Sequence, residues 1–302
     1  MRAHGDAPSE SSFKRVLDRA GLVKRRKKRP RREPARLQSG KPATAPNDIW
    51  TVDFKGWWMT PRGQRCEPLT IRDDYSRFIL SIKVLETWGT AAVKAEFIRV
   101  FERNGLPEVI RSDNGSPFAS TRSPLGLSAL SVWFVAQGIE LDRIEPGHPE
   151  QNGGHERMHR DIRAELQGLI EGDLKNHQEV FDAWRHEFNW ERPHEALGMR
   201  VPGEVYSKSR RAYEAEIPQI QYPPQYLIRK VSNAGMLTVD DKRIFISSSL
   251  RGWHVGLKPV TMQTLEVWFD NLRLGEIDLT AEAYIEACPG AKPRGTTATT
   301  ER

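Results

Sequence analysis

The sequence predicts an α/β core with a mixed five-stranded sheet flanked by helices, followed by a small all-β domain. Three β-rich runs separated by turn signals begin at residue 49. Helical and β-rich segments then alternate up to residue 190, which is typical of a mixed sheet covered by helices. Between residues 226 and 279, several short β-like runs follow one another closely and indicate a small barrel.

The core elements follow from apolar spacing and from Gly and Pro stop signals. The first three strands form an antiparallel meander with turns at the PRGQ and DDYS sequences. Strands are expected over 49–57, 66–72, 77–84, 107–112 and 138–144. Helices are expected over 89–104, 124–137, 155–170 and 174–190.

A basic tract dominates the charge of the chain. The net charge is +6, and residues 24–36 hold nine Lys or Arg and one acidic residue, so the rest of the chain has a net charge of −2. Such a run is typical of contact with nucleic acid, a membrane surface or an import receptor, and it is equally compatible with a solvated, disordered tail. Pro30 and Pro34 favour an extended arm over a membrane helix.

Secretion and membrane insertion are not expected. No apolar stretch reaches the ~18 residues of a membrane span, and the N-terminal segment MRAHGDAPSESS lacks the hydrophobic region of a signal peptide. Cys66 and Cys288 are too few for a disulfide framework or a four-thiolate zinc site. We therefore expect a reducing, cytoplasmic setting.

Three acidic residues lie where the backbone would bring them together. Asp53 is in the middle of an apolar strand, Asp113 follows a strand in the sequence RSDNGSPF, and Glu156 begins a helix after PGHPEQNGG. Each has an ordinary alternative: a solvent-facing edge residue, an Asx turn, and charge compensation at a helix N-terminus. Their joint order favours a site, because a mid-strand carboxylate is costly without a cation or a partner, and strand ends are where α/β sheets bind ligands.

Such a trio suits two-metal phosphoryl transfer. Three carboxylates can hold two Mg²⁺ ions ~3.5–4 Å apart, one activating the attacking oxygen and the other stabilising the leaving oxygen. Hard oxygen ligands fit Mg²⁺ (or Mn²⁺) better than the scattered histidines do. His148, His155 and His159 have no cysteine nearby, so a zinc site is not expected.

The motifs, in order, resemble a known family. They are WTVDFKG (50–56), DYSR (74–77), SDNGSPF (112–118), PGHPEQNGGHER (146–157) and NWERPHEAL (189–197). Together they are similar to the catalytic core of DDE transposases and retroviral-type integrases, and most similar to bacterial insertion-sequence transposases of the IS481 type. The resemblance is strong over residues 46–206 and less specific over 226–279.

The resemblance implies an RNase H-like core, an SH3-like C-terminal barrel and a DDE triad of Asp53, Asp113 and Glu156 that binds two Mg²⁺ or Mn²⁺ ions. It also implies phosphodiester hydrolysis and 3′-OH strand transfer on double-stranded DNA by a homodimer or a larger synaptic assembly, at the nucleoid and without a membrane partner. The implied domains are a remnant helix of a helix-turn-helix module (1–23), a basic linker (24–47), the core (48–206), a linker (207–225), the barrel (226–280) and a disordered tail (281–302).

Two features depart from the family pattern. Between Asp113 and Glu156, 42 residues intervene, more than is usual, and the segment 119–131 fits a loop insertion. Glu150 and Glu145 are therefore lesser candidates for the third acid. The helix-turn-helix module is represented only by the helix over 9–23, as in a truncated copy or one whose recognition domain is encoded separately.

Basic residues near the triad are candidates for DNA phosphate contacts. Glu156, Arg160 and Arg163 share one helix face. Lys55 is two residues after Asp53, so its side chain is expected on the same side of the strand. The basic arm adds Lys24, Arg25, Arg26, Lys27, Lys28 and Arg29. A solvated basic face is the ordinary alternative.

A catalytically idle DNA-binding relic and an RNase H-like nuclease are the competing functions.

Overall fold

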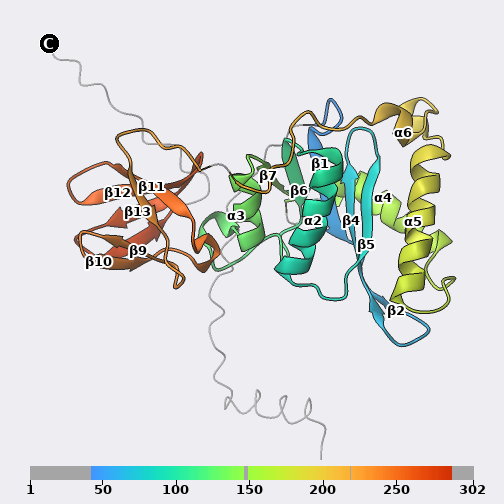
Figure 1. The fold of residues 1–302 in the computed structure, drawn as a ribbon, viewed down its shortest axis with the longest axis horizontal. Coiled ribbons are helices and arrows are strands. Elements are labelled where there is room, and N and C mark those ends of the chain that lie inside the picture. The colour runs from blue at the N-terminus through green and yellow to red at the C-terminus, as the bar shows by residue number, and fades with distance from the viewer. Residues whose placement is uncertain (1–41, 146–148, 218, 288–302) are drawn as a thin grey trace, which may run out of the picture. The chain divides into compact units, whose positions relative to one another are not determined.

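The computed structural model describes residues 42–145, 149–217 and 219–287 (Figure 1). The expected helix over 9–23, the basic residues 24–29 and most of the expected tail lie outside these ranges. Within them, no helix has the length and apolar character needed to cross a membrane.

The core is built on a mixed five-stranded sheet of order β5-β4-β1-β6-β7. Its strands are β1 (Ile49–Phe54), β4 (Pro68–Asp73), β5 (Ile79–Val84), β6 (Val109–Ser112) and β7 (Glu140–Arg143). β4 pairs antiparallel with both β1 and β5, which confirms the predicted meander. β6 pairs parallel with β1 and with β7. A small hairpin, β2 (Trp58–Met59) with β3 (Arg65–Cys66), connects β1 to β4.

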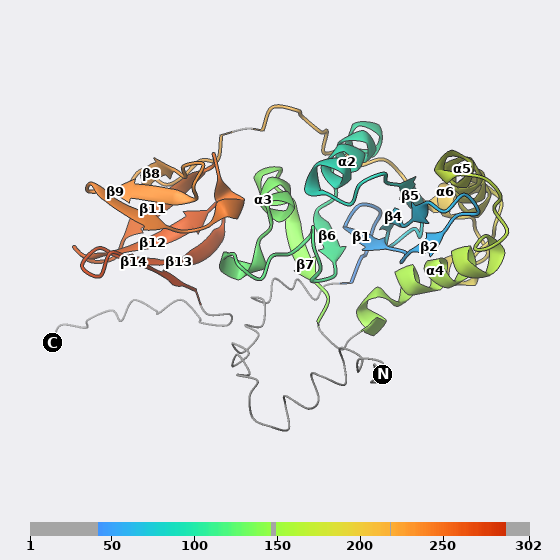
Figure 2. The same ribbon diagram turned by 90° about the horizontal axis from the view of Figure 1, so that it is seen from below.

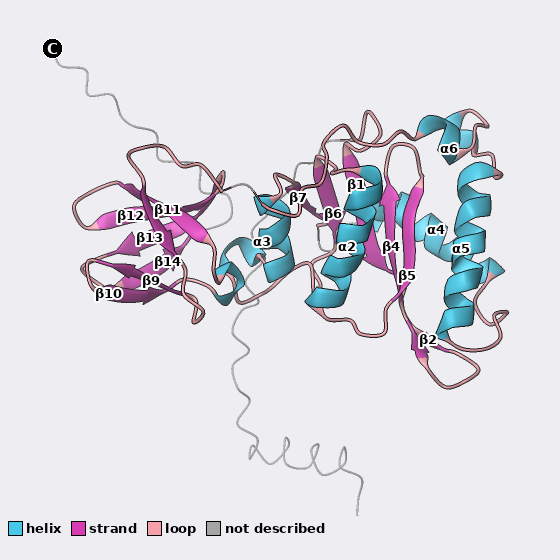
Figure 3. Ribbon diagram, in the orientation of Figure 1, coloured by secondary structure: helices cyan, strands magenta, loops and turns pink. Residues whose placement is uncertain are grey.

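Helices cover both faces of this sheet (Figures 2 and 3). On one face, α2 (Thr90–Asn104) and α3 (Ala129–Ala136) pack Phe97, Phe101 and Phe134 against apolar residues of β1 and β4. On the other, α4 (Gly153–Glu165) and α5 (Leu174–Trp190) bury their apolar stripes against β5. A mixed sheet with helices on both faces is the predicted RNase H-like arrangement, so the fold class is confirmed.

The helix boundaries differ from the prediction at two places. The helix expected over 124–137 begins at Ala129, because Leu125 has a φ of 53° and Ser128 forms a capping box with Ser131. Pro124–Gly126 form a short 3₁₀ turn, η1, instead. The helix expected over 155–170 spans Gly153–Glu165. Short elements close the core: η2 (Pro149–Asn152), η3 (Glu195–Leu197) and α6 (Pro202–Val205).

The C-terminal part is all-β, as predicted. Its five-stranded antiparallel sheet has the order β14-β13-β12-β11-β8, and β9 and β10 form a separate hairpin. The bounds are β8 (Leu227–Lys230), β9 (Met236–Val239), β10 (Lys242–Phe245), η4 (Ser248–Leu250), β11 (His254–Pro259), β12 (Thr264–Phe269), β13 (Leu272–Asp278) and β14 (Ala283–Glu286). The edge strands β8 and β14 contact β9 and β10, so the hairpin encloses the apolar core.

The predicted start of the tail at residue 281 is wrong. Ala283–Glu286 form β14 and pair antiparallel with residues 275–278 of β13. This strand is short, with only Tyr284 and Ile285 as large apolar residues, and its partner strand lies next to it in the chain. Its pairing therefore stabilises a segment whose own sequence pattern is weak.

Candidate active site

Asp53 and Asp113 leave neighbouring parallel strands at the same edge of the sheet. Val52 pairs with Ser112 in the β1–β6 ladder, and each acid is the next residue in its strand direction. Glu156 lies in the first turn of α4. Asp113 and Glu156 are exposed, whereas the Asp53 side chain is only 29% exposed.

The three acids influence one another electrostatically. Burial, the negative charge of Asp113 and that of Glu156 together raise the pKa of Asp53 to about 7, against the opposing effect of a backbone hydrogen bond from Phe54. A carboxyl group that is both desolvated and surrounded by like charge favours its neutral form. The sequence-predicted trio therefore shares one electrostatic environment.

The donor chemistry of the trio fits a divalent cation. Carboxylate oxygens are the ligands that Mg²⁺ and Mn²⁺ prefer, and a cation would offset the like-charge repulsion that Asp53 experiences. Across residues 42–145, 149–217 and 219–287, no three His, Cys, Asp or Glu residues already converge on one ion position. The fit is therefore one of charge and ligand type.

Glu156, the preferred candidate for the third acid, influences Asp53 electrostatically. Glu156 is among the charges that raise the pKa of Asp53. The backbone N–H of Glu145 donates to Oε1 of Gln151, 2.9 Å away. The side chain of Glu150 lies outside the described part of the chain. The choice of Glu156 stays a prediction supported by this electrostatic contact.

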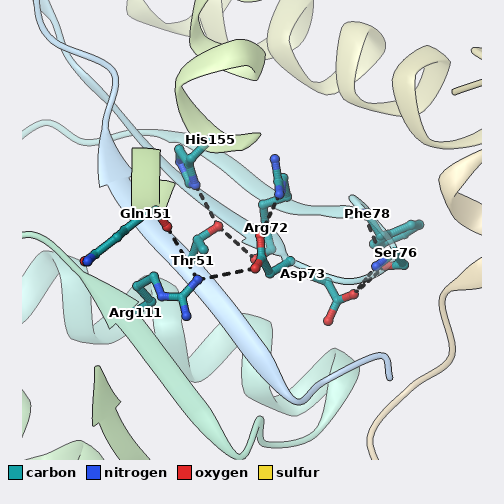
Figure 4. Close-up of polar contacts among 9 residues, drawn as sticks. Thr51, Arg72, Asp73, Ser76, Phe78, Arg111, Gln151 and His155 are labelled. Carbon is teal, nitrogen blue, oxygen red and sulfur yellow. Dashed lines mark hydrogen bonds and ion pairs between the residues drawn. The ribbon is translucent and has the colours of Figure 1, made fainter. Parts of the chain in front are cut away.

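Two buried histidines of α4 anchor the helix to the sheet, and the sequence analysis assigned them no such role. Nδ1 of His155 lies 2.8 Å from Oγ1 of Thr51 on β1, and Nε2 lies 2.6 Å from Oγ1 of Thr70 on β4. Figure 4 shows the His155–Thr51 contact. His159 lies 2.8 Å from the same Thr70 hydroxyl and 3.8 Å from the Asp53 carboxylate.

Both rings are neutral at physiological pH. Burial and the positive charge of Lys55 and Arg72 lower the pKa of His159 to about 3. Burial also lowers the pKa of His155 well below its usual value. His159 is consequently a neutral neighbour of Asp53. One signal was available in the sequence: His155, Met158, His159 and Ile162 follow the spacing of a buried helix face.

A buried arginine lies against the start of α4. The Arg72 guanidinium packs against Gly154, where a Cβ atom would overlap it. Nη2 of Arg72 donates to Asp74 across 2.8 Å, and Asp74 also pairs with Arg111, which donates to Asp142. Arg111 also contacts the backbone carbonyl of Gln151 at 3.5 Å, as Figure 4 shows. These contacts fix the entry into α4, two residues before Glu156.

Arg143, at the end of β7, lies near Asp113. Burial lowers the pKa of Arg143 to about 10, and the negative charge of Asp113 opposes this shift. Nη2 of Arg143 donates to Ser131, 3.1 Å away, whereas buried Nη1 has no hydrogen-bond partner among the described residues. Burying a charged guanidinium is unfavourable unless an anion lies near it. Asp113 partly offsets this cost, and an anionic ligand would offset it further.

The structure describes three of the predicted phosphate-binding residues. Arg160 and Arg163 are exposed on α4, on the same side as Glu156. Lys55 is half-buried after β1, and burial together with the positive charge of Arg163 lowers its pKa. Lys55 and Arg163 are thus close enough to influence each other electrostatically. Lys24–Arg29 lie outside the described residues.

Two family models called integrase core domain match residues 43–149 and 137–202. The insertion element IS407 protein of Burkholderia multivorans is 32% identical over 217 residues, which are 71% of this chain and 75% of that protein. The chain belongs to the integrase core family of insertion-element transposases. Asp53 and Asp113 lie in the first matched region and Glu156 in the second.

Two other proteins are also similar to this chain. The insertion element IS476 protein of Xanthomonas euvesicatoria is 29% identical over 216 residues, 71% of this chain and 60% of that protein. The HTLV-2 integrase catalytic core domain in complex with magnesium has 14% identity, a TM-score of 0.38 and coverage of 54% of this chain and 97% of that chain. The particular likeness of this transposase to IS481-type elements stays a prediction.

Proposed function

We propose that this chain is a DNA transposase that cleaves a phosphodiester at an element end and joins the resulting 3′-hydroxyl to target DNA, with divalent metal ions. The supporting observation is the raised pKa of Asp53 at the edge of the sheet, caused by burial and by the charges of Asp113 and Glu156. An accumulation of like charge in a half-buried position is typical of a site that uses a cation.

Asp53, Asp113 and Glu156 would hold Mg²⁺ or Mn²⁺. When bound, such ions lower the pKa of an attacking hydroxyl or water and stabilise the charge on the leaving oxygen. Asp53 is in β1 and Asp113 directly follows β6, each next to the Val52–Ser112 pair that ends the β1–β6 ladder, so this ladder positions both acids. The third is on α4, which is held by the contacts of His155 with Thr51 and Thr70 and by the packing of Arg72 against Gly154.

The basic residues around the acids would bind the DNA backbone. Lys55 is two residues after Asp53, and Arg160 and Arg163 are exposed one and two turns after Glu156 on α4, so they would provide positive charge for phosphates. Such contacts hold the phosphodiester in line with the attacking oxygen without reading sequence. Joining two element ends implies a dimer or larger assembly, which we include in the proposal together with the basic arm of residues 24–29.

Strand transfer by the full chain tests the proposal. A DNA end with a pre-cut 3′-hydroxyl is incubated with plasmid and Mg²⁺, and joined products are counted. We expect joining by the wild-type chain and its loss in Asp53→Asn, with Asp182→Asn, a surface acid of α5, as the control. Hydrolysis without joining would favour a nuclease, and joining by Asp53→Asn would remove this acid from the mechanism.

Replacing the candidate third acids separately tests their assignment. Glu156→Gln and Glu150→Gln each remove one charge with little change in volume. We expect the loss of joining only with Glu156→Gln. Loss only with Glu150→Gln would assign the third position to Glu150 instead.

A further inference from the structure

An exposed aromatic surface lies beside the acids and has no role in the function proposed above. Trp57 is 58% exposed, Met59 54% and Trp88 39%. Trp57 and Met59 belong to the β2–β3 hairpin region, and Trp88 lies between β5 and α2. Exposed tryptophans that come from separate segments and gather in one place are typical of a binding surface.

A single arginine links the two tryptophans. The Cζ atom of Arg65 lies 5.1 Å from the ring centre of Trp57 and 4.7 Å from that of Trp88. The guanidinium thus covers one face of each ring, and Glu67 holds it through a 2.6 Å ion pair. These contacts fix both rings in place while their exposed fractions leave aromatic surface open to solvent.

The topology puts this surface on the same edge of the sheet as the acids. β1 and β5 both pair antiparallel with β4, so they run in the same direction, and β6 runs parallel to β1. The C-terminal ends of β1, β5 and β6 therefore lie at the same edge of the sheet, the lower edge in Figure 1. Trp57 follows Asp53 by four residues, which limits the distance between their Cα atoms to ~14 Å.

The charges near the rings favour a polyanion as the partner. The amino group of Lys55 lies 6.0 Å from the ring centre of Trp58, the residue after Trp57, and close enough to Arg163 for the two charges to influence each other. Arg62, on the turn of the hairpin, has a side chain that is 67% exposed and a 3.4 Å contact with Asp173. Aromatic rings interleaved with cations are the features of surfaces that stack the bases of unpaired nucleic acid strands.

We propose that Trp57, Arg65 and Trp88 form a stacking surface for unpaired nucleobases at a DNA end, next to the phosphodiester held by the acids. This inference rests on the proposed function for its substrate. In a paired duplex the neighbouring bases cover both faces of each internal base and one face of the terminal pair. The two rings therefore gain more stacking area where the end is open than on a paired end. The surface would hold the end of the DNA in an opened form.

Binding without catalysis tests this inference. In EDTA, the full chain is titrated with two duplexes of arbitrary sequence, one fully paired and one with two mismatched base pairs at its end. Arbitrary sequence suffices because stacking tolerates every base. A contribution of ~1–3 kcal/mol per stacked base predicts about 5- to 150-fold tighter binding of the open end.

Matched variants make the test specific. Trp57→Ala and Trp88→Ala should each reduce the preference for the open end while the affinity for paired DNA is retained. Trp190→Ala, which removes an equally exposed tryptophan (51%) at the end of α5, should keep the preference. Trp57→Phe keeps an aromatic ring and should keep most of the preference for the open end. 2-Aminopurine in the unpaired segment should lose fluorescence on binding to the wild-type chain only.

Three outcomes would overturn the inference. The first is an equal preference for the open end in the wild type, Trp57→Ala and Trp88→Ala. The second is that Trp190→Ala loses the preference for the open end as much as Trp57→Ala and Trp88→Ala do. The third is loss of self-association in Trp57→Ala with unchanged DNA binding, which would assign the surface to a second copy of the chain. A wild-type chain that binds neither duplex would instead contradict the proposed function.

Discussion

Nδ1 of His155 lies 2.8 Å from the hydroxyl oxygen of Thr51, and this contact joins the first turn of α4 to the strand that carries Asp53. The other ring nitrogen contacts Thr70 on the adjacent strand. A fully buried side chain directly before Glu156 thus ties the third predicted acid to β1, which carries the first, and to the neighbouring strand β4.

Replacing His155 by Leu should weaken metal binding more than it weakens the fold. The change removes one hydrogen-bond partner from each of two buried threonine hydroxyls, which we expect to cost about 1–3 kcal/mol of stability. It should also lower the affinity for Mn²⁺ by about 10-fold or more, because Glu156 loses its support. Urea unfolding and calorimetric titration with Mn²⁺ measure the two effects.

His177→Leu is the control for this substitution. His177 is also buried, on α5, and its Nδ1 contacts the backbone carbonyl of Asp173 at 2.9 Å, away from the acids. It should lose stability without losing metal affinity. Equal losses of Mn²⁺ affinity in both variants would show that His155 has only a general structural role.

Gly154→Ala and Gly153→Ala should have opposite effects. A Cβ at Gly154 would overlap the buried Arg72 guanidinium, whereas a Cβ at Gly153 meets no atom within 4 Å. We expect Gly154→Ala to destabilise the chain by about 1–3 kcal/mol and Gly153→Ala to be neutral or to stabilise it by up to about 1 kcal/mol. Denaturant unfolding of the two variants measures this difference. Equal unfolding midpoints would contradict the packing of Arg72 against Gly154.

Metal binding should release a proton near neutral pH. With a pKa of about 7, Asp53 is partly protonated in the free chain, and only its carboxylate binds a cation. The affinity for Mg²⁺ should therefore rise as the pH increases from 6 to 8. Calorimetric titrations in two buffers with different ionisation enthalpies measure the released protons.

Asp48→Asn and Asp53→Asn are the paired variants for this measurement. Hydrogen bonds from Thr44 and Ala45 outweigh the effect of burial and lower the pKa of Asp48, so this residue is already ionised. Asp48→Asn should release protons as the wild type does, and Asp53→Asn should release fewer. Unchanged release in Asp53→Asn would assign the titrating group elsewhere.

Arg160→Gln and Arg163→Gln should each reduce the salt dependence of DNA binding. Each phosphate contact adds about one unit to the slope of log K against log salt, so each variant should lower it by about that amount. Lys175→Gln removes a similarly exposed charge on α5 and should leave the slope unchanged. Affinities measured over a range of salt concentrations test this; a slope that falls equally with Lys175→Gln would indicate only a general charge effect.

Local patterns predicted the elements, and long-range contacts explain the differences. Alternation and turn residues located β1, β4 and β5, and helical spacing located α5 at Leu174–Trp190. The late start of α3 depends on the side-chain cap of Ser128. The contacts of Arg72 with Asp74 and Gly154 follow from the packing of a strand against a helix 80 residues later in the chain, which no short-range pattern contains.

The parallel pairing of Val52 with Ser112 joins segments that are far apart in the chain. During synthesis the chain contains Asp53 before β6 and α4 have been made, so the three acids cannot yet come together. Only the complete sheet unites these acids, and non-local pairing of this kind forms slowly. For the function proposed above, folding itself would therefore act as a safeguard against premature cleavage of DNA.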